Sequence, residues 1–352
     1  MKNFDYFRPA TVAEAVAAAA EPGTVYLAAG TNLLDLMKGG VTRPDRLVDV
    51  TRLPGLDRIE NLSDGGVRIG ALVRNADLAH NSGFAASYPA VAEALLSGAS
   101  AQLRNAATVG GNLLQRTRCG YFYDTASACN KREPGSGCAA RSGENRLHAV
   151  LGWSEACIAT HPSDFCVPLV ALGAVVEIEG QNGRREITLE ALHCLPGDTP
   201  ERDTMLEPGD LIVAVRLPAD ASAFARHSRY LKVRERTSFA FAVVSAAASL
   251  RIEDGRIRDA RLALGGVAAK PWRARAAEEI LTGSSPGQGV FRRASAAALA
   301  KATPSGDNQF KIELAERILV RSLTLAVRGT PERVPALPAS AFSSIAGALI
   351  DA

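Results

Sequence analysis

Four of the six cysteines fall in one short part of the chain and are the residues best suited to carry chemistry. Cys119, Cys129, Cys138 and Cys157 are separated by nine, eight and eighteen residues. The segment from Arg116 to Asn145 is rich in glycine, serine and charged residues and lacks apolar periodicity, which predicts an irregular loop. A long loop without its own apolar core needs something to order it, and four thiolates around a metal would do so.

The cysteine spacing leaves the chemistry open. It matches neither CxxC…CxxC nor a ferredoxin run, so zinc and an iron–sulfur cluster both suit the four sulfurs. Unrelated thiols, or disulfides in an oxidising compartment, are the alternatives. Of the remaining cysteines, Cys166 lies in an apolar stretch and is expected to be a small buried hydrophobe, and Cys194 has no partner pattern. His148 and His161 flank the loop and could support or replace a ligand.

Two glycine-containing turns offer backbone N–H groups that a phosphate could approach. The first surrounds Gly30, and the second contains Gly110 and Gly111. Neither turn is GxGxxG, and the chain has no GxxxxGK, so the signatures of a Rossmann site and of a P-loop are both missing. Taken alone, each turn is more simply explained as a loop that needs a positive φ, the commoner use of glycine.

The elements that must position these residues form two parts. The first hundred residues alternate between helical and strand patterns, which indicates a mixed α/β domain. We expect helices after Thr11 and over 33–38 and 89–96, and strands over 25–29, 46–50 and 67–73. Residues 218–222 read as a linker. After it, strand patterns at 228–234 and 240–252 and a helix at 273–281 predict a smaller α+β domain.

Composition limits the class of protein. The 352 residues suggest two or three domains, and 47% hydrophobic with 22% charged residues is typical of a folded globular chain. A net charge of +3, from 40 basic and 37 acidic residues, argues against a nucleic-acid partner. The apolar stretches fall short of a membrane span, and the first residues lack the apolar core of a secretory signal.

Four segments in the same order resemble the FAD-binding subunits of molybdenum hydroxylases. They are 25–34, 104–112, 162–164 and 262–268, and the resemblance covers nearly the whole chain. It implies an α+β fold: a two-subdomain FAD-binding domain of the PCMH/vanillyl-alcohol oxidase type, then a smaller α+β C-terminal domain of the CO dehydrogenase flavoprotein type. The implied boundaries are 1–220, with subdomains of about 1–55 and 56–220 and a cysteine-rich insertion at about 116–160, then 225–330 and a tail at 331–352. We expect the tail to lie against a partner.

The cysteine loop is where this chain departs from most of that family. The family aspartate normally follows the second turn closely, but here Asp164 comes much later, after the four cysteines. This arrangement is similar to the periplasmic aldehyde oxidoreductase FAD-binding subunit with an inserted [4Fe–4S] loop and, more distantly, to the β subunit of 4-hydroxybenzoyl-CoA reductase. The resemblance implies that Cys119, Cys129, Cys138 and Cys157 bind a [4Fe–4S] cluster.

The same resemblance implies the FAD contacts. The second turn supplies Thr108, Gly111 and Asn112, Asp164 accepts hydrogen bonds from the ribose or adenine, and Ile212 contacts the rings. Lys232 is expected near the flavin, with a solvated lysine at a strand end as the alternative. The first turn holds the pyrophosphate and lines the site with Leu27, Ala28, Ala29, Gly30, Thr31, Asn32, Leu33 and Leu34.

The implied function is electron transfer within a heterotrimeric molybdenum-containing aldehyde oxidoreductase. A large molybdopterin-binding subunit oxidises the aldehyde, a small subunit relays electrons through two [2Fe–2S] clusters, and FAD passes them to an external acceptor. The chain then needs no catalytic residue of its own. Alternatives are a β subunit of a 4-hydroxybenzoyl-CoA reductase-like enzyme, a stand-alone flavin oxidase and a zinc-stabilised nucleotide-binding module. Its location is expected to be periplasmic, by co-export with a signal-bearing partner, or cytoplasmic.

Overall fold

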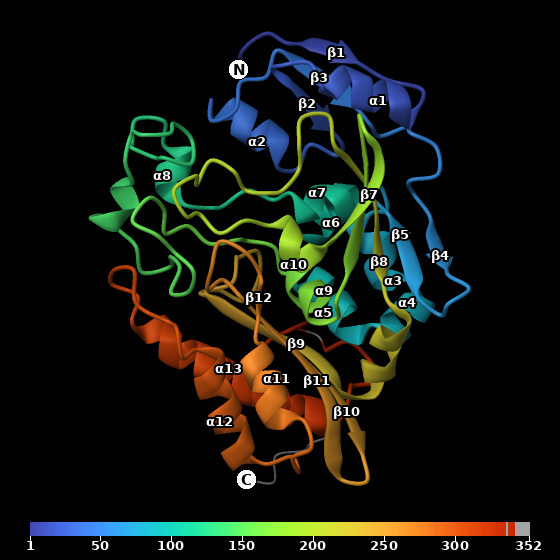
Figure 1. Ribbon diagram of the computed structural model, residues 1–352, viewed down its shortest axis with the longest axis vertical. Helices are drawn as coiled ribbons and strands as arrows, with labels where there is room; N and C mark the ends of the chain where they lie inside the picture. The colour runs from blue at the N-terminus through green and yellow to red at the C-terminus, as the bar shows by residue number, and fades with distance from the viewer. Residues whose placement is uncertain (336, 342–352) are drawn as a thin grey trace.

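The structure of the chain is a computed structural model that describes residues 1–335 and 337–341. Three sheets follow one another along its long axis (Figure 1). A three-stranded sheet lies at the N-terminal end, a five-stranded sheet lies in the middle, and a four-stranded sheet with three helices on it forms the other end. This is the α+β architecture that the sequence predicted.

The N-terminal sheet is parallel and carries the first glycine turn. Its strand order is β1-β3-β2, from β1 (Asp5–Phe7), β3 (Arg46–Asp49) and β2 (Thr24–Leu27), with helices α1 (Val12–Ala19) and α2 (Leu33–Lys38). The predicted capping box begins α1. Thr11 Oγ1 accepts from the Glu14 N–H, and the Glu14 carboxylate accepts from the Ala10 N–H.

The middle sheet is antiparallel, in the order β4-β5-β8-β6-β7, and packs against short helices that carry the second glycine turn. Its strands are β4 (Ile59–Asn61), β5 (Val67–Gly70), β6 (Val175–Gly180), β7 (Gly183–Thr188) and β8 (Leu211–Leu217). The accompanying helices are α3 (Asn75–His80), α4 (Ser82–Ser87), α5 (Pro89–Ser97), α6 (Ala101–Ala106), α7 (Val109–Leu113), α9 (Cys166–Ala171) and α10 (Leu189–Leu192).

The third sheet is antiparallel, in the order β12-β11-β10-β9. It contains β9 (Ser228–Val233), β10 (Val244–Glu253), β11 (Arg256–Gly265) and β12 (Trp272–Arg273), covered by α11 (Arg275–Leu281), α12 (Gln288–Ala298) and α13 (Phe310–Val327). Two expectations need correction. Residues 240–243 are not part of a strand, and the expected linker is the start of the 3-10 helix η2 (Ala219–His227), which buries Ala221 and Phe224.

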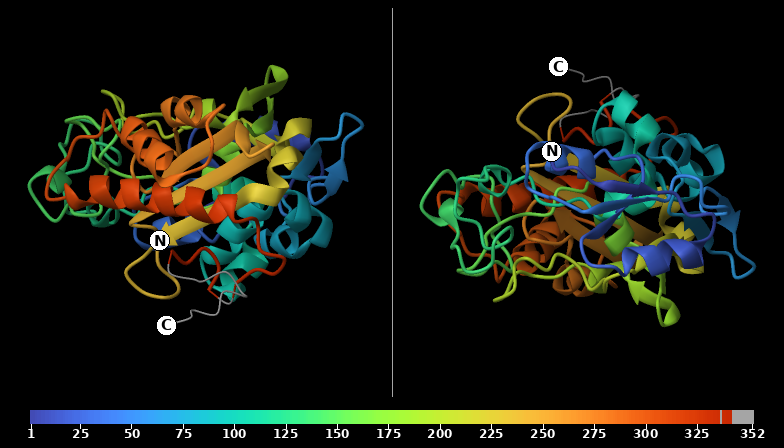
Figure 2. Two further views of the ribbon diagram at one scale, coloured as in Figure 1. Left: turned by 90° about the horizontal axis from the view of Figure 1, so that it is seen from below. Right: turned by 90° about the horizontal axis from the view of Figure 1, so that it is seen from above.

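The cysteine-rich segment is irregular, as predicted. It contains only α8 (Gly120–Tyr123), the 3-10 helix η1 (Ala139–Arg141) and isolated bridges. Its far end is attached to the start of α13, and both views in Figure 2 show these segments side by side. The buried Lys311 ammonium donates to the carbonyls of Leu147, His148 and Gly266 at 2.6–2.8 Å. These contacts fix the loop to the third sheet.

A buried ion pair joins the third sheet to the helices of the middle layer. The Arg229 guanidinium on β9 donates to both carboxylate oxygens of Glu93 on α5, at 3.2 and 2.9 Å. The described part of the tail packs here as well, because the Ala339 N–H donates to Glu93 and the Ala339 carbonyl accepts from the Lys232 N–H. The described part of the tail thus packs against its own chain. The expected contact with a partner also involves residues 336 and 342–352, which lie outside the described residues.

Over residues 1–335 and 337–341, the structure contains no helix with the length and hydrophobicity needed to cross a membrane.

Candidate flavin site and cysteine loop

A cavity of about 1160 Å³ lies where the three layers meet. Its wall includes Thr31 and Asn32 from the first turn, Asn112 from the second turn, and Asp164 and Lys232. The chain between β9 and β10, including Phe239 to Val243, covers another side. The volume is slightly above the usual range for ligand pockets, about 300–1,000 Å³, so the cavity can hold a ligand as large as a dinucleotide.

The first turn needs its glycine for the backbone itself. Gly30 has a φ of +73°, and a Cβ there would meet the Leu34 side chain at 2.7 Å. Only Thr31 and Asn32 of the eight residues predicted from this turn line the cavity. The other six, Leu27, Ala28, Ala29, Gly30, Leu33 and Leu34, shape the turn and the start of α2 behind that wall.

Of the three residues predicted from the second turn, only Asn112 lines the cavity, whereas Thr108 and Gly111 do not. Thr108 caps α7, since its Oγ1 accepts from the Gly111 N–H at 3.3 Å. Gly111 does not have a positive φ, and the nearest atom to a Cβ there would be Thr108 Oγ1 at 3.2 Å. The Asn32 side chain donates to the Gly111 carbonyl at 3.4 Å, which brings the two turns together. The backbone at Gly111 therefore does not require glycine, but a Cβ there would press on the Thr108 hydroxyl that caps α7.

Asp164 and Lys232 form a buried pair on the cavity wall. The Lys232 ammonium donates to Asp164 Oδ2 at 2.7 Å, and the Tyr230 hydroxyl donates to Oδ1 at 2.5 Å. Burial and the adjacent carboxylate raise the pKa of Tyr230 well above its usual value. Lys232 is therefore not a solvated lysine at a strand end. Asp164 accepts one protein donor on each oxygen, and each oxygen keeps a lone pair, so its role as an acceptor for the ribose or adenine stays a prediction.

Ile212 is not on the cavity wall. It lies in β8 opposite Ile178 of β6, and its side chain is buried in the core of the middle layer. The predicted contact with the rings has no support in this placement.

Arg118, which no sequence pattern indicated, lines the cavity immediately before the first loop cysteine. Its guanidinium donates to the Asn32 side-chain oxygen and to the Tyr123 hydroxyl, and it lies 5.0 Å from the centre of the Phe241 ring. A guanidinium beside both glycine turns is suited to the charge of a pyrophosphate. The one sequence feature that could have pointed to Arg118 is its position next to Cys119.

The four loop cysteines line one small second cavity and are all free thiols. Cys119 lines the large cavity as well, so the two cavities share a wall. Burial raises the pKa of Cys119 to about 11, and His148 Nε2 lies 3.2 Å from its sulfur. Lys131, which is buried and paired with Asp203 at 2.5 Å, also lines the cysteine cavity.

The loop sulfurs are more widely spaced than the ligands of one metal ion. Among residues 1–335 and 337–341, only His161, Cys166 and His193 bring three ligand atoms within 4.8 Å of one another. Four thiolates around a single zinc, with Zn–S bonds of about 2.3 Å, lie about 3.8 Å apart.

Comparison with known proteins agrees with this geometry. Residues 2–220 match the family of the FAD binding domain in molybdopterin dehydrogenase, and residues 229–326 match the CO dehydrogenase flavoprotein C-terminal domain. The chain is 52% identical to the aldehyde oxidoreductase FAD-binding subunit PaoB of Escherichia coli, over 93% of this chain and 99% of that protein. It is 26% identical to the carbon monoxide dehydrogenase medium chain of Hydrogenophaga pseudoflava, over 92% and 97%.

The fold agrees with a solved structure as well. Carbon monoxide dehydrogenase from Hydrogenophaga pseudoflava superimposes with a TM-score of 0.72 at 27% identity, covering 93% of this chain and 98% of that chain. The predicted fold class is confirmed. The chain belongs to the FAD-binding flavoprotein subunits of the molybdenum hydroxylases, and is thus one subunit of a multi-subunit oxidoreductase.

Proposed function

We propose that the chain is the electron-transferring flavoprotein subunit of a heterotrimeric aldehyde oxidoreductase. The observation that carries the proposal is the 52% identity with PaoB over nearly the full length of both chains. The partners are a large molybdopterin-binding subunit, where the aldehyde is oxidised, and a small subunit with two [2Fe–2S] clusters. FAD supplies the redox chemistry when bound, and the residues of this chain bind and orient it.

FAD occupies the large cavity in this proposal. Thr31, Asn32 and Asn112 offer polar side chains at the two turns, and Arg118 adds a positive charge between them. Lys232 lies on the same cavity wall, where Asp164 holds its ammonium group in place and balances its charge. These groups suit the phosphate oxygens and hydroxyls of a dinucleotide.

The four loop cysteines hold a [4Fe–4S] cluster in this proposal. Their shared cavity, their free thiols and a spacing wider than one zinc ion requires all favour a cluster over a zinc-stabilised module. Burial raises the pKa of the Cys157 thiol, and the neighbouring positive charge of Lys131 opposes that shift. Because Cys119 reaches both cavities, the cluster lies next to the FAD.

Replacement of Gly111 by valine tests the FAD site. The φ at Gly111 is not positive, so Gly111→Val should fold with a small shift of the Thr108 side chain, while the valine side chain blocks the approach of the pyrophosphate. We expect FAD affinity to fall at least about tenfold, measured by calorimetry on the apoprotein. Gly287→Val is the control, because that glycine is extended and no atom lies within 4 Å of the place that a Cβ would take. Full FAD affinity in Gly111→Val would exclude close contact at this turn.

Replacement of the loop cysteines tests the cluster. Serine at Cys119, Cys129, Cys138 or Cys157 should remove most of the iron, because each thiolate supplies one of four ligands. Iron analysis and absorption spectra of anaerobically purified chain measure this, with Cys194→Ser as the control that keeps its iron. A wild-type chain without iron, or four serine variants that all retain it, would contradict the cluster.

Dependence on partners tests the function. The single chain should bind FAD without oxidising aldehydes, and co-expression with the two proposed partner subunits should restore oxidation. In the anaerobic complex without an acceptor, an aromatic aldehyde should bleach the flavin absorption. If the single chain oxidised aldehydes as fast as the complex, it would be a stand-alone oxidase. If the flavin stayed oxidised in the active complex without an acceptor, FAD would not lie on the electron-transfer path.

A further inference from the structure

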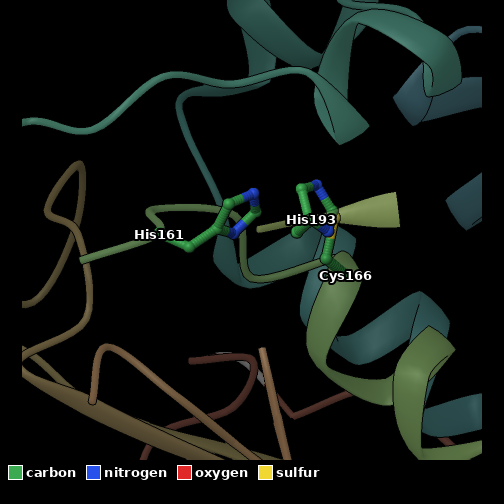
Figure 3. A group of neighbouring side chains, drawn as sticks. All are labelled: His161, Cys166 and His193. Carbon is green, nitrogen blue, oxygen red and sulfur yellow. The ribbon is translucent and has the colours of Figure 1, made fainter. Parts of the chain in front are cut away.

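A second group of possible metal ligands lies outside the cysteine cavity. His161, Cys166 and His193 come from three segments and converge in the protein interior (Figure 3). Their ligand atoms lie within 4.8 Å of one another, and all three residues are buried. We propose that these side chains form a structural zinc site, separate from the [4Fe–4S] cluster.

The histidine rings present free nitrogens in a place without solvent. His193 Nδ1 and His161 Nε2 are both buried and have no hydrogen-bond partner. His193 Nε2 lies 2.8 Å from the Leu113 carbonyl and donates to it, which leaves the lone pair on Nδ1. A histidine that ligates a metal through one nitrogen usually donates from the other to such an acceptor. An unpartnered buried nitrogen is costly for a protein, and a metal would relieve that cost.

The two histidines are in the neutral form that binds a metal, whereas the Cys166 thiol must first lose its proton. Burial lowers the pKa of both histidines, and the proximity of His193 lowers that of His161 further, so both rings are neutral. Burial raises the pKa of the Cys166 thiol to about 12, so zinc must displace its proton. The Ser163 N–H donates to His161 Nδ1 at 3.4 Å. Zinc binding through Nε2 would move the ring proton to Nδ1 and break this weak hydrogen bond.

The donor set selects the metal class. Two imidazoles and one thiolate suit zinc, whereas magnesium and calcium prefer oxygen ligands. Zinc takes four ligands, and the fourth would be a water in a cavity of about 20 Å³ that His161 and His193 line and Cys166 does not. Thr117 and the Lys131–Asp203 pair form part of its wall. The three protein ligands must close by up to about 1 Å to reach normal zinc distances.

The site would tie the cysteine loop to the flavin site. His161 ends the cysteine-rich segment, three residues before Asp164, and Cys166 begins α9. His193 follows α10, and its ring is hydrogen-bonded to the carbonyl of Leu113, the last residue of α7. One ion would therefore fix the positions of the loop end, α7 and α9 together.

Zinc analysis of the full chain tests the proposal. Chain treated with a chelator and then incubated anaerobically with zinc sulfate should retain about one zinc with mixed nitrogen and sulfur ligands, read by mass spectrometry and zinc X-ray absorption. Zinc should also raise the midpoint of urea unfolding. Cys166→Ser and His193→Gln should lose the zinc and its stabilising effect, while Cys194→Ser, next to His193 but outside the group, should keep both.

Two controls separate this site from the cysteine loop. Cys129→Ser should keep the zinc, and Cys166→Ser should keep its iron, so failure of the cluster proposal would leave the zinc result interpretable. If zinc does not change the urea unfolding midpoint of Cys166→Ser while that variant still binds FAD, the variant has lost a zinc ligand and has not misfolded. A wild-type chain that retains no zinc, or zinc with sulfur ligands only that disappears in Cys129→Ser, would overturn the proposal.

Discussion

The buried ion pair between Asp164 and Lys232 holds the flavin cavity together. Asp164 follows the cysteine loop and precedes α9, while Lys232 belongs to β9 of the third sheet. Their side chains are 7% and 1% exposed, so each charge depends on the other. Leaving one partner of such a pair alone costs about 3–5 kcal/mol. The pair therefore sets the distance between two layers across the cavity, and the Glu93–Arg229 pair reinforces the same junction.

The construction of this junction explains why the large cavity and the cysteine cavity lie together. Asp164 lies on the cavity wall where the chain leaves the cysteine loop, and Cys119 lies on the same wall near the start of the loop. Lys311 fixes the far end of the loop, because its three carbonyl acceptors belong to the loop and to the third sheet. The loop is thus held at both ends beside the large cavity.

Local patterns predicted the parts of this protein that depend on local physics. The Thr11 capping box, the irregular cysteine loop and the need for Gly30 follow from neighbouring residues, and each is present. The surroundings of Asp164 and Ile212 could not be predicted because they depend on tertiary partners. Tyr230 and Lys232 each donate to one oxygen of Asp164, and the strand carries Ile212 into the core. Arg118 belongs to no motif, so its place beside the glycine turns could not be predicted. It depends on the tertiary contact that brings the two turns together.

A double-mutant cycle on Asp164 and Lys232 is the sharpest test of this junction. The measurement is the free energy of unfolding in urea for Asp164→Asn, Lys232→Met and the double variant, each without FAD. We expect a loss of about 3 kcal/mol for each single variant, and a double variant no less stable than either, hence strong coupling. Small losses that add in the double variant would show that this pair does not hold the two layers together.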